Sequence, residues 1–364
     1  MRHRFHSICP YFAMFPETFV KKQLAETHHD GVVFDPFCGR GTTIFESLLL
    51  GRSAAGCDIH PVAACISGAK SNPPKMYDVL ARLDALEESF DASVGLQYPL
   101  DLEAFFSACF EQHTYKQVLH LRAQLAWQVN RTDRFIAALC LGALHGESHR
   151  SPNYFSNRMP RTISTKPAYS VRWWAKNGYF PPPRNVFAIL RYATAYRFRT
   201  PPPERVGRVA LSDARQASKR FPELKGQVTD VITSPPYLDT TNYREDQWLR
   251  LWFLGETASS KQQSDDGRHC NVDRYWTFLQ EAWNGLRPLL ASEVRMVVRI
   301  GSRKLKKEEL SQRLIETLSE GTGGMLVQLF DGGFTSPIER SQANSFRGSK
   351  ASPIEEHDFC FILS

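Results

Sequence analysis

The stretch of the chain that most clearly suggests chemistry is Ser-Pro-Pro-Tyr at residues 234–237, directly after the strand-like run Asp230–Thr233. Consecutive prolines supply carbonyl acceptors without N–H donors and hold the backbone extended. Together with the Ser234 hydroxyl, they predict a rigid edge that accepts hydrogen bonds. This edge suits an exocyclic amino group, because accepting both N–H bonds turns the nitrogen lone pair towards an electrophile. The Tyr237 ring adds a surface on which an extruded base can stack, worth about 1–3 kcal/mol per base.

A second candidate site is the loop "FDPFCGRGTT", in which Gly39 and Gly41 lie between an expected strand and an expected helix. Glycines at such a turn let backbone N–H groups approach a ligand closely. Asp35 at the strand end would repel a pyrophosphate but would accept hydrogen bonds from an ammonium group. The next expected strand ends at Asp58, where a carboxylate can accept both ribose hydroxyls. A ribose, an amino acid head and no phosphates describe S-adenosylmethionine. An ordinary βαβ turn remains the alternative.

Three stretches resemble a known enzyme family. "DPFCGRGTT", "GCDIHP" and "TSPPY" are similar to the cofactor and catalytic loops of the amino-methylating DNA methyltransferases, which methylate cytosine at N4 or adenine at N6 with S-adenosylmethionine. The upstream "YFAMFPETFVKKQL" resembles the family's Phe-Pro segment, which lines the methionine end of the cofactor. The resemblance covers about the first 70 residues and residues 205–364. It implies a Rossmann-like class I methyltransferase fold, with a mostly parallel seven-stranded sheet and helices on both faces.

The resemblance also assigns roles to single residues. It implies a catalytic loop of Ser234, Pro235, Pro236 and Tyr237. It implies cofactor contacts from Phe15, Pro16, Asp35, Phe37, Cys38, Gly39, Gly41, Thr42, Asp58, Ile59 and Asp213. Packing is the alternative role for Cys38, and a turn acid is the alternative for Asp213. Within the family, Ser-Pro-Pro-Tyr goes more often with cytosine and Asp-Pro-Pro-Tyr with adenine, so Ser234 favours N4 of a flipped-out cytosine.

The predicted function is therefore that of a site-specific, cytosine-N4-specific DNA methyltransferase in a restriction–modification or epigenetic system. Double-stranded DNA is the expected partner, and a cognate restriction endonuclease is a candidate partner. Three alternatives stay open: an N6-adenine DNA methyltransferase, an RNA methyltransferase of the guanine-N2 type, and a catalytically dead protein that binds nucleic acid.

The positive charge of the chain is concentrated in one segment. Arg150–Arg208 holds twelve Lys or Arg residues and one acid, Glu204, a local charge of +11 within a net charge of +7. Eleven aromatic residues lie among these cations between Tyr154 and Phe198. Cations neutralise phosphates and aromatic rings stack on displaced bases, so the segment is expected to grip DNA. The candidate DNA contacts are Arg158, Arg161, Lys166, Arg172 and Lys176. The alternative is a small aromatic core with a solvated cationic face.

The order of elements predicts one interrupted α/β sheet. A βαβ rhythm over the first 75 residues announces a parallel sheet, and strand-like runs resume at "RVALSDA" and continue to "HDFCFILS". We expect a catalytic domain of residues 1–75 and 205–364, with an inserted helical and basic-aromatic region at 76–204. Within the insertion, "LEAFFSACF" has the spacing of a helix face, whereas the Pro-rich passage after residue 146 is expected to be irregular. "DQWLRLWFLG" is expected to form a helix that packs on the sheet.

Composition and sequence pattern indicate the cellular compartment in which the protein is expected. The longest apolar run, Phe135–Leu144, is ten residues, too short to span a bilayer, and the N-terminus lacks the apolar core of a secretory signal. The eight cysteines contain no Cys-x-x-Cys pair, so neither a disulfide framework nor a zinc site is expected. We expect a cytoplasmic protein, associated with the nucleoid of a prokaryotic host, with neither a metal nor a membrane partner.

Overall fold

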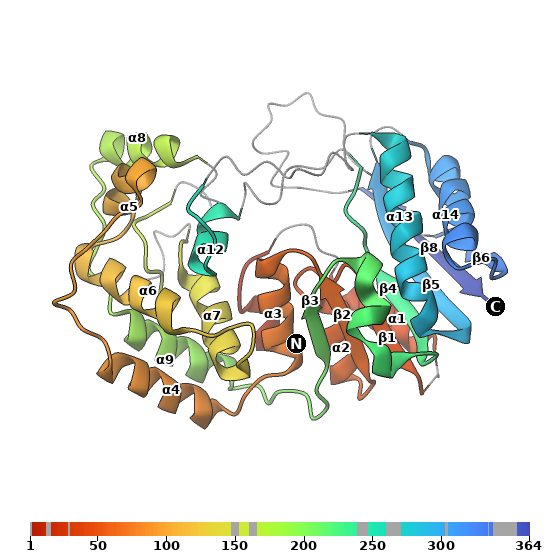
Figure 1. Ribbon diagram of the computed structural model, residues 1–364, viewed down its shortest axis with the longest axis horizontal. Helices are drawn as coiled ribbons and strands as arrows, with labels where there is room; N and C mark the ends of the chain where they lie inside the picture. The colour runs from red at the N-terminus through yellow and green to blue at the C-terminus, as the bar shows by residue number, and fades with distance from the viewer. Residues whose placement is uncertain are drawn as a thin grey trace. The chain divides into compact units, whose positions relative to one another are not determined.

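The computed structural model describes residues 2–11, 16–27, 30–146, 153–159, 166–238, 247–259, 271–302, 305–333, 335–337 and 355–364 (Figure 1). These residues form two compact units. The helical unit comprises Met1–Pro10, Asn72–Pro202 and Asn242–Gln263, and the sheet unit comprises Tyr11–Ser71, Pro203–Thr241 and Ser264–Ser364. The sequence-based domain boundaries at residues 75 and 205 stay a prediction.

The sheet unit is built on a sheet whose described strands follow the order β3-β2-β1-β4-β5-β8-β6, with a short β7 that also pairs β8. The first five strands in this order are parallel, whereas β8 is antiparallel to its neighbours. The predicted Rossmann-like class I methyltransferase fold is thus confirmed, with one short strand added. The strands are β1 Val32–Asp35, β2 Ala54–Asp58, β3 Arg208–Leu211, β4 Val228–Thr233, β5 Leu290–Ser302, β6 Val327–Asp331, β7 Thr335–Pro337 and β8 Glu355–Leu363.

The helices of the sheet unit connect these strands (Figure 1). They are α1 Glu17–Ala25, α2 Thr42–Leu49, α3 Pro61–Ser71, α10 Ala217–Arg220, α13 Val272–Leu286 and α14 Lys307–Gly321, with short 3-10 turns at Ala214–Gln216, Pro222–Leu224 and Arg287–Leu289.

Both faces of the sheet are covered by helices. Phe34 and Val231 belong to a buried cluster shared with α13 and α14. Their neighbours Val33 and Ile232 point to the other face and pack with α1 and α2. Side chains alternate between the two faces of a strand, so a sheet that is buried on both sides needs nearly continuous apolar runs. The sequences of β1 and β4 meet this need.

The carboxyl ends of β1, β2 and β4 meet at one edge of the sheet. Phe34 pairs with Ala55 of β2 and with Val231 of β4, so the segments after these strands begin side by side. β4 ends at Thr233, which confirms that the strand stops immediately before Ser234. Ligands of parallel α/β sheets bind at such an edge.

The helical unit contains a separate set of helices. They are α4 Met76–Glu88, α5 Glu103–Cys109, α6 Gln112–Gln124, α7 Arg131–Ala143, α8 Pro167–Asn177, α9 Val186–Arg197 and α12 Trp248–Phe253, with 3-10 turns at Arg4–Ser7 and Leu100–Leu102. None of the helices within the described part of the chain is long and apolar enough to cross a membrane.

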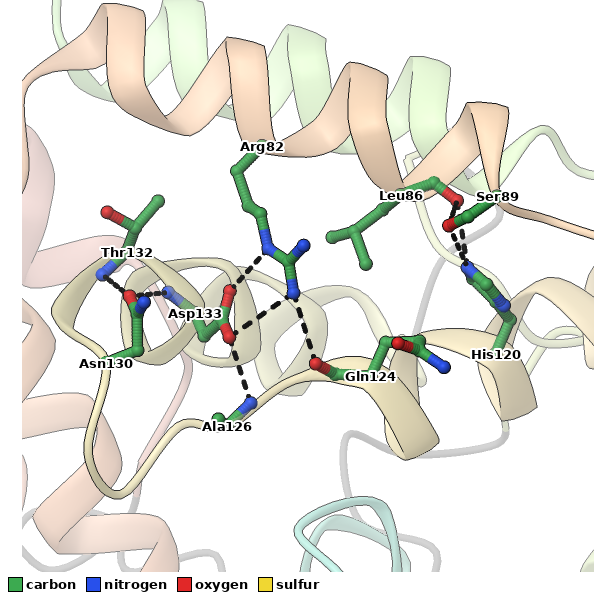
Figure 2. A network of polar contacts seen from close by, with 9 residues as sticks. All are labelled: Arg82, Leu86, Ser89, His120, Gln124, Ala126, Asn130, Thr132 and Asp133. Carbon is green, nitrogen blue, oxygen red and sulfur yellow. Dashed lines mark hydrogen bonds and ion pairs between the residues drawn. The ribbon is translucent and has the colours of Figure 1, made fainter.

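An ion pair ties three helices of the helical unit together. Arg82 of α4 donates through Nε to Asp133 of α7 at 2.9 Å and through Nη2 to the carbonyl of Gln124 at the end of α6 (Figure 2). Asp133 also accepts from the backbone N–H of Ala126 at 3.0 Å. Asn130 caps α7 through its side-chain oxygen. Because Asp133 is buried, removing Arg82 would leave an unpaired charge in the core.

Two expectations for the helical unit were wrong. The passage after residue 146 is not irregular throughout, since it contains α8 and α9. Pro167 lies at the first turn of α8, and Pro181, Pro182 and Pro183 lie ahead of α9. At the first turn of a helix a missing N–H costs nothing. The run "DQWLRLWFLG" does contain a helix, α12, but this helix belongs to the helical unit and packs on α5 instead of on the sheet. The ring centroid of Trp248 lies 5.0 Å from that of Phe105, and the ring centroid of Trp252 lies 4.6 Å from that of Phe106. The predicted apolar face of α5 is confirmed as buried.

Substitution of Gly41 tests the close packing behind the glycine loop. Gly41 has a φ of 71°, and a Cβ there would lie 2.6 Å from Cβ of Ser67. Gly51 has a φ of 74°, and no atom of a described residue lies within 4 Å of such a Cβ, so it is a matched control. Alanine costs about 1–2 kcal/mol at either glycine because of the left-handed backbone. We expect Gly41→Ala to lower the free energy of unfolding by about 1–3 kcal/mol more than Gly51→Ala, measured by urea denaturation. Equal losses would contradict the packing described.

Candidate functional site

The glycine loop is shaped by two left-handed residues. Gly39 has a φ of 49° and Gly41, which precedes α2, has a φ of 71°. Among the described residues, a Cβ on Gly39 would meet only the Tyr11 ring, at 3.9 Å. Within this part of the chain, space is therefore open at Gly39 and closed at Gly41. The loop can admit a ligand at its first glycine, while the second lets α3 approach the backbone.

Asp35 joins the glycine loop to the loop after β4. Its side chain is buried, and Oδ1 accepts hydrogen bonds from the Thr233 hydroxyl at 2.6 Å and from the Phe37 N–H at 3.1 Å. Burial raises the pKa of Asp35 to about 7, against the opposing effect of these hydrogen bonds. A buried carboxylate at the end of a strand is suited to receive a cationic group, whose charge would favour the ionised form.

Asp58 holds the glycine loop against the end of β2. Its Oδ2 accepts from the Gly39 N–H at 2.8 Å, and its Oδ1 accepts from the His60 N–H at 2.8 Å. Burial raises the pKa of Asp58 to about 6, although both hydrogen bonds favour the ionised form. A carboxylate oxygen has a second lone pair, so the side chain that shapes the loop can also accept a ligand hydroxyl.

The Ser-Pro-Pro-Tyr loop begins beside Asp35 and is held by a third strand. The Ser234 hydroxyl donates to Oη of Tyr237 at 3.4 Å, and Oη donates to Oε1 of Glu356 on β8 at 2.8 Å. Pro235 is buried, whereas Pro236 and Tyr237 are half-buried. Burial and the Glu356 charge raise the pKa of Tyr237 well above its ordinary value, so its hydroxyl stays protonated. Asp35, Gly39, Asp58 and this loop therefore share one edge of the sheet.

Sequence reasoning missed the polar groups behind Tyr237. Arg299 of β5 donates to both oxygens of Asp358, at 2.6 and 2.8 Å, and its Nη1 lies 3.8 Å from Glu356. Its guanidinium also lies 4.0 Å from the ring centroid of Phe19. An arginine inside the apolar run of β5 and two acids two residues apart on β8 were the available signals. They are informative only once the two strands are known to pair, with Arg299 opposite Asp358.

The side chains of Phe37 and Cys38 are committed to packing. The Phe37 ring contacts the rings of Phe278 and Trp283. Cys38 is buried with its Sγ 3.4 Å from the Ser67 hydroxyl. Burial raises the pKa of the Cys38 thiol well above its usual value, so it is unreactive. Any contact of these two residues with a cofactor is expected to come from their backbone.

The other described residues that were predicted to contact the cofactor lie near the ends of helices or strands. Thr42 is buried at the start of α2, and Ile59, just after β2, is 59% exposed. Pro16 is exposed ahead of α1. Phe15 lies outside the described residues. An exposed Ile59 beside Asp58 is free to cover a ligand held by that carboxylate.

Asp213 follows β3 at the same edge, and its carboxylate is engaged by Arg215. Oδ1 accepts from the Arg215 N–H at 2.9 Å and from Nε at 3.1 Å, and Oδ2 accepts from Nη2 at 2.8 Å. These bonds fit the role of a turn acid. The predicted contact with adenine stays a prediction.

The predicted DNA-contacting residues belong to the helical unit. Arg158 is exposed, with its guanidinium 5.1 Å from the Tyr179 ring centroid. Lys166 is the N-cap residue of α8, and Arg161 lies outside the described residues. The aromatic residues are divided between two roles: Phe155, Trp174 and Phe187 are buried, and Tyr169, Phe180 and Tyr192 are exposed.

One face of α8 combines cations with an aromatic ring. Tyr169, Arg172 and Lys176 follow the i, i+3, i+7 spacing of a single helix face, and all three are exposed. Ser170 and Trp174 are buried on the opposite side. The helix is therefore anchored by Trp174 and presents the other three side chains outward.

Metal ligands do not gather among the described residues, which contain no group of three or more His, Cys, Asp or Glu side chains able to hold an ion. The seven described cysteines form no disulfide bond with one another.

Replacement of Asp35 tests the cost of its burial. Between about pH 4 and pH 7 the folded protein holds a proton on Asp35 that the unfolded chain releases, so this group's contribution to stability falls as pH rises. The Asp35→Asn variant has no carboxyl group at this position, so this pH-dependent loss of stability is absent from it. We expect the stability of D35N relative to the unmodified protein to rise by about 2–3 kcal/mol from about pH 5 to about pH 8, measured by urea unfolding. Asp30→Asn, at an exposed site, is the matched control for the loss of a carboxyl group. A pH-independent difference for D35N would contradict the assignment.

Comparison with known proteins gives one family match. Residues 3–67 match the family model described as DNA methylase. Comparison with curated proteins finds no match. Two solved structures of the rRNA methyltransferase aviRa from Streptomyces viridochromogenes are 13% identical to the chain. They cover 99% and 97% of this chain and 94% and 89% of their own, with TM-scores of 0.31 and 0.32. The family match supports the resemblance to amino-methylating DNA methyltransferases over the segment that holds Asp35, the glycine loop and Asp58.

Proposed function

We propose that the protein is an S-adenosylmethionine-dependent DNA methyltransferase that methylates N4 of a flipped-out cytosine at specific sites. The observation that carries the proposal is the hydrogen bond from Thr233 to Asp35, at 2.6 Å. It joins the end of β1, where the glycine loop begins, to the end of β4, where the Ser-Pro-Pro-Tyr loop begins, at the edge where parallel α/β sheets generally bind ligands. The match of residues 3–67 to DNA methylases supports the same reading.

The edge of the sheet that carries the glycine loop has hydrogen-bonding groups that suit the cofactor. S-adenosylmethionine, when bound, supplies a methyl group activated by its sulfonium charge. Asp35 would accept from its ammonium group, and the free lone pairs of Asp58 would accept from its ribose hydroxyls. The open space at Gly39 would admit the ligand, and Ile59 would cover it.

The Ser-Pro-Pro-Tyr loop would hold the base. The Ser234 hydroxyl and the Pro235 carbonyl would accept the two N–H bonds of the cytosine amine, and the Tyr237 ring would support the base. Orientation of the amine towards the methyl group supplies most of the rate in such a reaction. Methylation at specific sites would suit a restriction–modification or epigenetic role, with a cognate restriction endonuclease as a candidate partner.

The exposed face of α8 is the proposed contact with the DNA backbone. Two phosphate contacts contribute about 1.8 to the slope of the logarithm of the binding constant against the logarithm of salt concentration. We expect Arg172→Ala combined with Lys176→Ala to reduce the slope by about this amount, measured by fluorescence anisotropy with duplex DNA. Lys219→Ala combined with Arg220→Ala removes the same charge from exposed sites in the sheet unit. If both double variants lower the slope equally, α8 is not the contact.

Identification of the methylated nucleoside tests the reaction itself. The chain is expressed in a host that lacks its own DNA methyltransferases, and hydrolysed DNA and total RNA are analysed by mass spectrometry. We expect N4-methylcytosine in DNA from cells with the unmodified protein, and a loss of at least about tenfold with Ser234→Ala. N6-methyladenine in DNA would overturn the choice of base, and N2-methylguanine in RNA the choice of nucleic acid. No methylated nucleoside, together with no binding of S-adenosylmethionine by calorimetry, would identify a dead scaffold.

A further inference from the structure

The hydroxyls of Ser234 and Tyr237 and the carboxylate of Glu356 form a directed chain. Tyr237 donates to Glu356 at 2.8 Å, so its oxygen is available to accept from Ser234, which donates to it at 3.4 Å. Each hydrogen therefore points away from the sheet edge and towards β8. The Ser234 oxygen is left with lone pairs only, and it can accept from a substrate amine but cannot donate to a ring nitrogen.

We propose that Glu356 is a positioning residue that orients this chain and receives, through it, the proton that the substrate amine loses. The proposal rests on the function proposed above. Methyl transfer breaks the S–CH3 bond, whose electron pair stays on sulfur, and forms an N–CH3 bond that leaves the nitrogen cationic. An N–H proton then passes to Ser234 while the Ser234 proton passes to Tyr237 and the Tyr237 proton to Glu356. The carboxylate becomes a neutral acid, the amine becomes neutral, and the proton later leaves to water.

The surroundings of Glu356 suit this task. Its side chain is 23% exposed, so water can reach it to remove the proton. Among the described residues, the charged groups near it include Arg299 of β5, with Nη1 at 3.8 Å, and Asp358 of β8, which pairs with two other nitrogens of the same guanidinium. Asp358 therefore takes one N–H donor each from Nε and Nη2 of Arg299. Glu356 stays near a positive charge without being locked to it, and its Oε1 remains directed to Tyr237.

The weaker link of the chain is the contact between Ser234 and Tyr237. Its length of 3.4 Å exceeds the usual range of about 2.5–3.0 Å for O–H···O bonds. Catalytic hydrogen bonds in ligand-free enzymes are often long and tighten only in the reacting complex. An amine that donates to Ser234 would increase the polarity of the Ser234 O–H group and shorten this contact.

The test compares Glu356→Gln and Tyr237→Phe with Glu355→Gln as the matched control. Glutamine can still accept from Tyr237 but cannot take up its proton, and phenylalanine keeps the ring but ends the chain. Glu355 is the exposed neighbour on β8. We measure single-turnover methylation of unmethylated genomic DNA and the calorimetric Kd of S-adenosylmethionine. E356Q and Y237F are each expected to be about 100-fold slower, E356Q/Y237F no slower than Y237F, and E355Q unchanged. All four should bind the cofactor within about twofold of the unmodified protein.

A second readout does not depend on turnover. Burial and the carboxylate charge of Glu356 raise the pKa of Tyr237. Without that charge, Tyr237 of the E356Q variant should ionise at lower pH. The ionisation is followed as phenolate absorbance that is absent from E356Q/Y237F. Full activity of E356Q, additive losses in the double variant, or unchanged Tyr237 ionisation would overturn the proposal while leaving the methyltransferase function in place. A wild-type protein that transfers no methyl group would instead overturn the proposed function, and the proton path with it.

Discussion

A single buried hydrogen bond sets the geometry on which the site depends. Thr233 and Asp35 are 198 residues apart in sequence, yet their side chains meet at 2.6 Å at the ends of adjacent parallel strands. The pairing of β1 with β4 brings them together, and burial makes the contact costly for the ionised carboxylate, whose pKa rises to about 7. In the protein without a ligand, such a carboxylate is a suitable binding group for a cation. Functional sites commonly store unfavourable electrostatics of this kind, because the ligand relieves it.

The same arrangement recurs elsewhere in the site, where a group from another strand holds a residue of each loop in place. Asp58 at the end of β2 holds Gly39 of the loop after β1, and Glu356 of β8 holds Tyr237 of the loop after β4. Such cross-strand support keeps reactive groups in place without a ligand, which is what precise positioning of a substrate requires. The proposed chemistry consists mainly of orientation, so a rigid and largely preformed edge is an appropriate scaffold for it.

Much of this edge could be predicted from the sequence, since strand periodicity, a glycine turn and a Pro-Pro pair are local signals. They located Asp35, Asp58 and residues 234–237 and indicated an interrupted α/β sheet, whereas the methyltransferase fold was implied by the resemblance. The partners Thr233, Arg299 and Glu356 could not be found in this way, because their roles arise from the pairing of β1 with β4 and of β5 with β8. Local patterns also misplaced α12, whose apolar residues would suit a sheet or a helix bundle equally well. Prolines likewise concealed α8 and α9, because they mark helix starts as readily as loops.

We propose that Asp35, Asp58 and Ser234 bound a single cavity that holds the methyl donor and the base together. A crystal structure with S-adenosylmethionine bound tests it most directly. We expect the ammonium group at Asp35, the ribose at Asp58, and the sulfonium methyl facing the Ser234 hydroxyl across a gap that fits a pyrimidine amine. A ligand bound elsewhere, or a methyl group directed away from Ser234, would rule out this cavity as the methyl-transfer site.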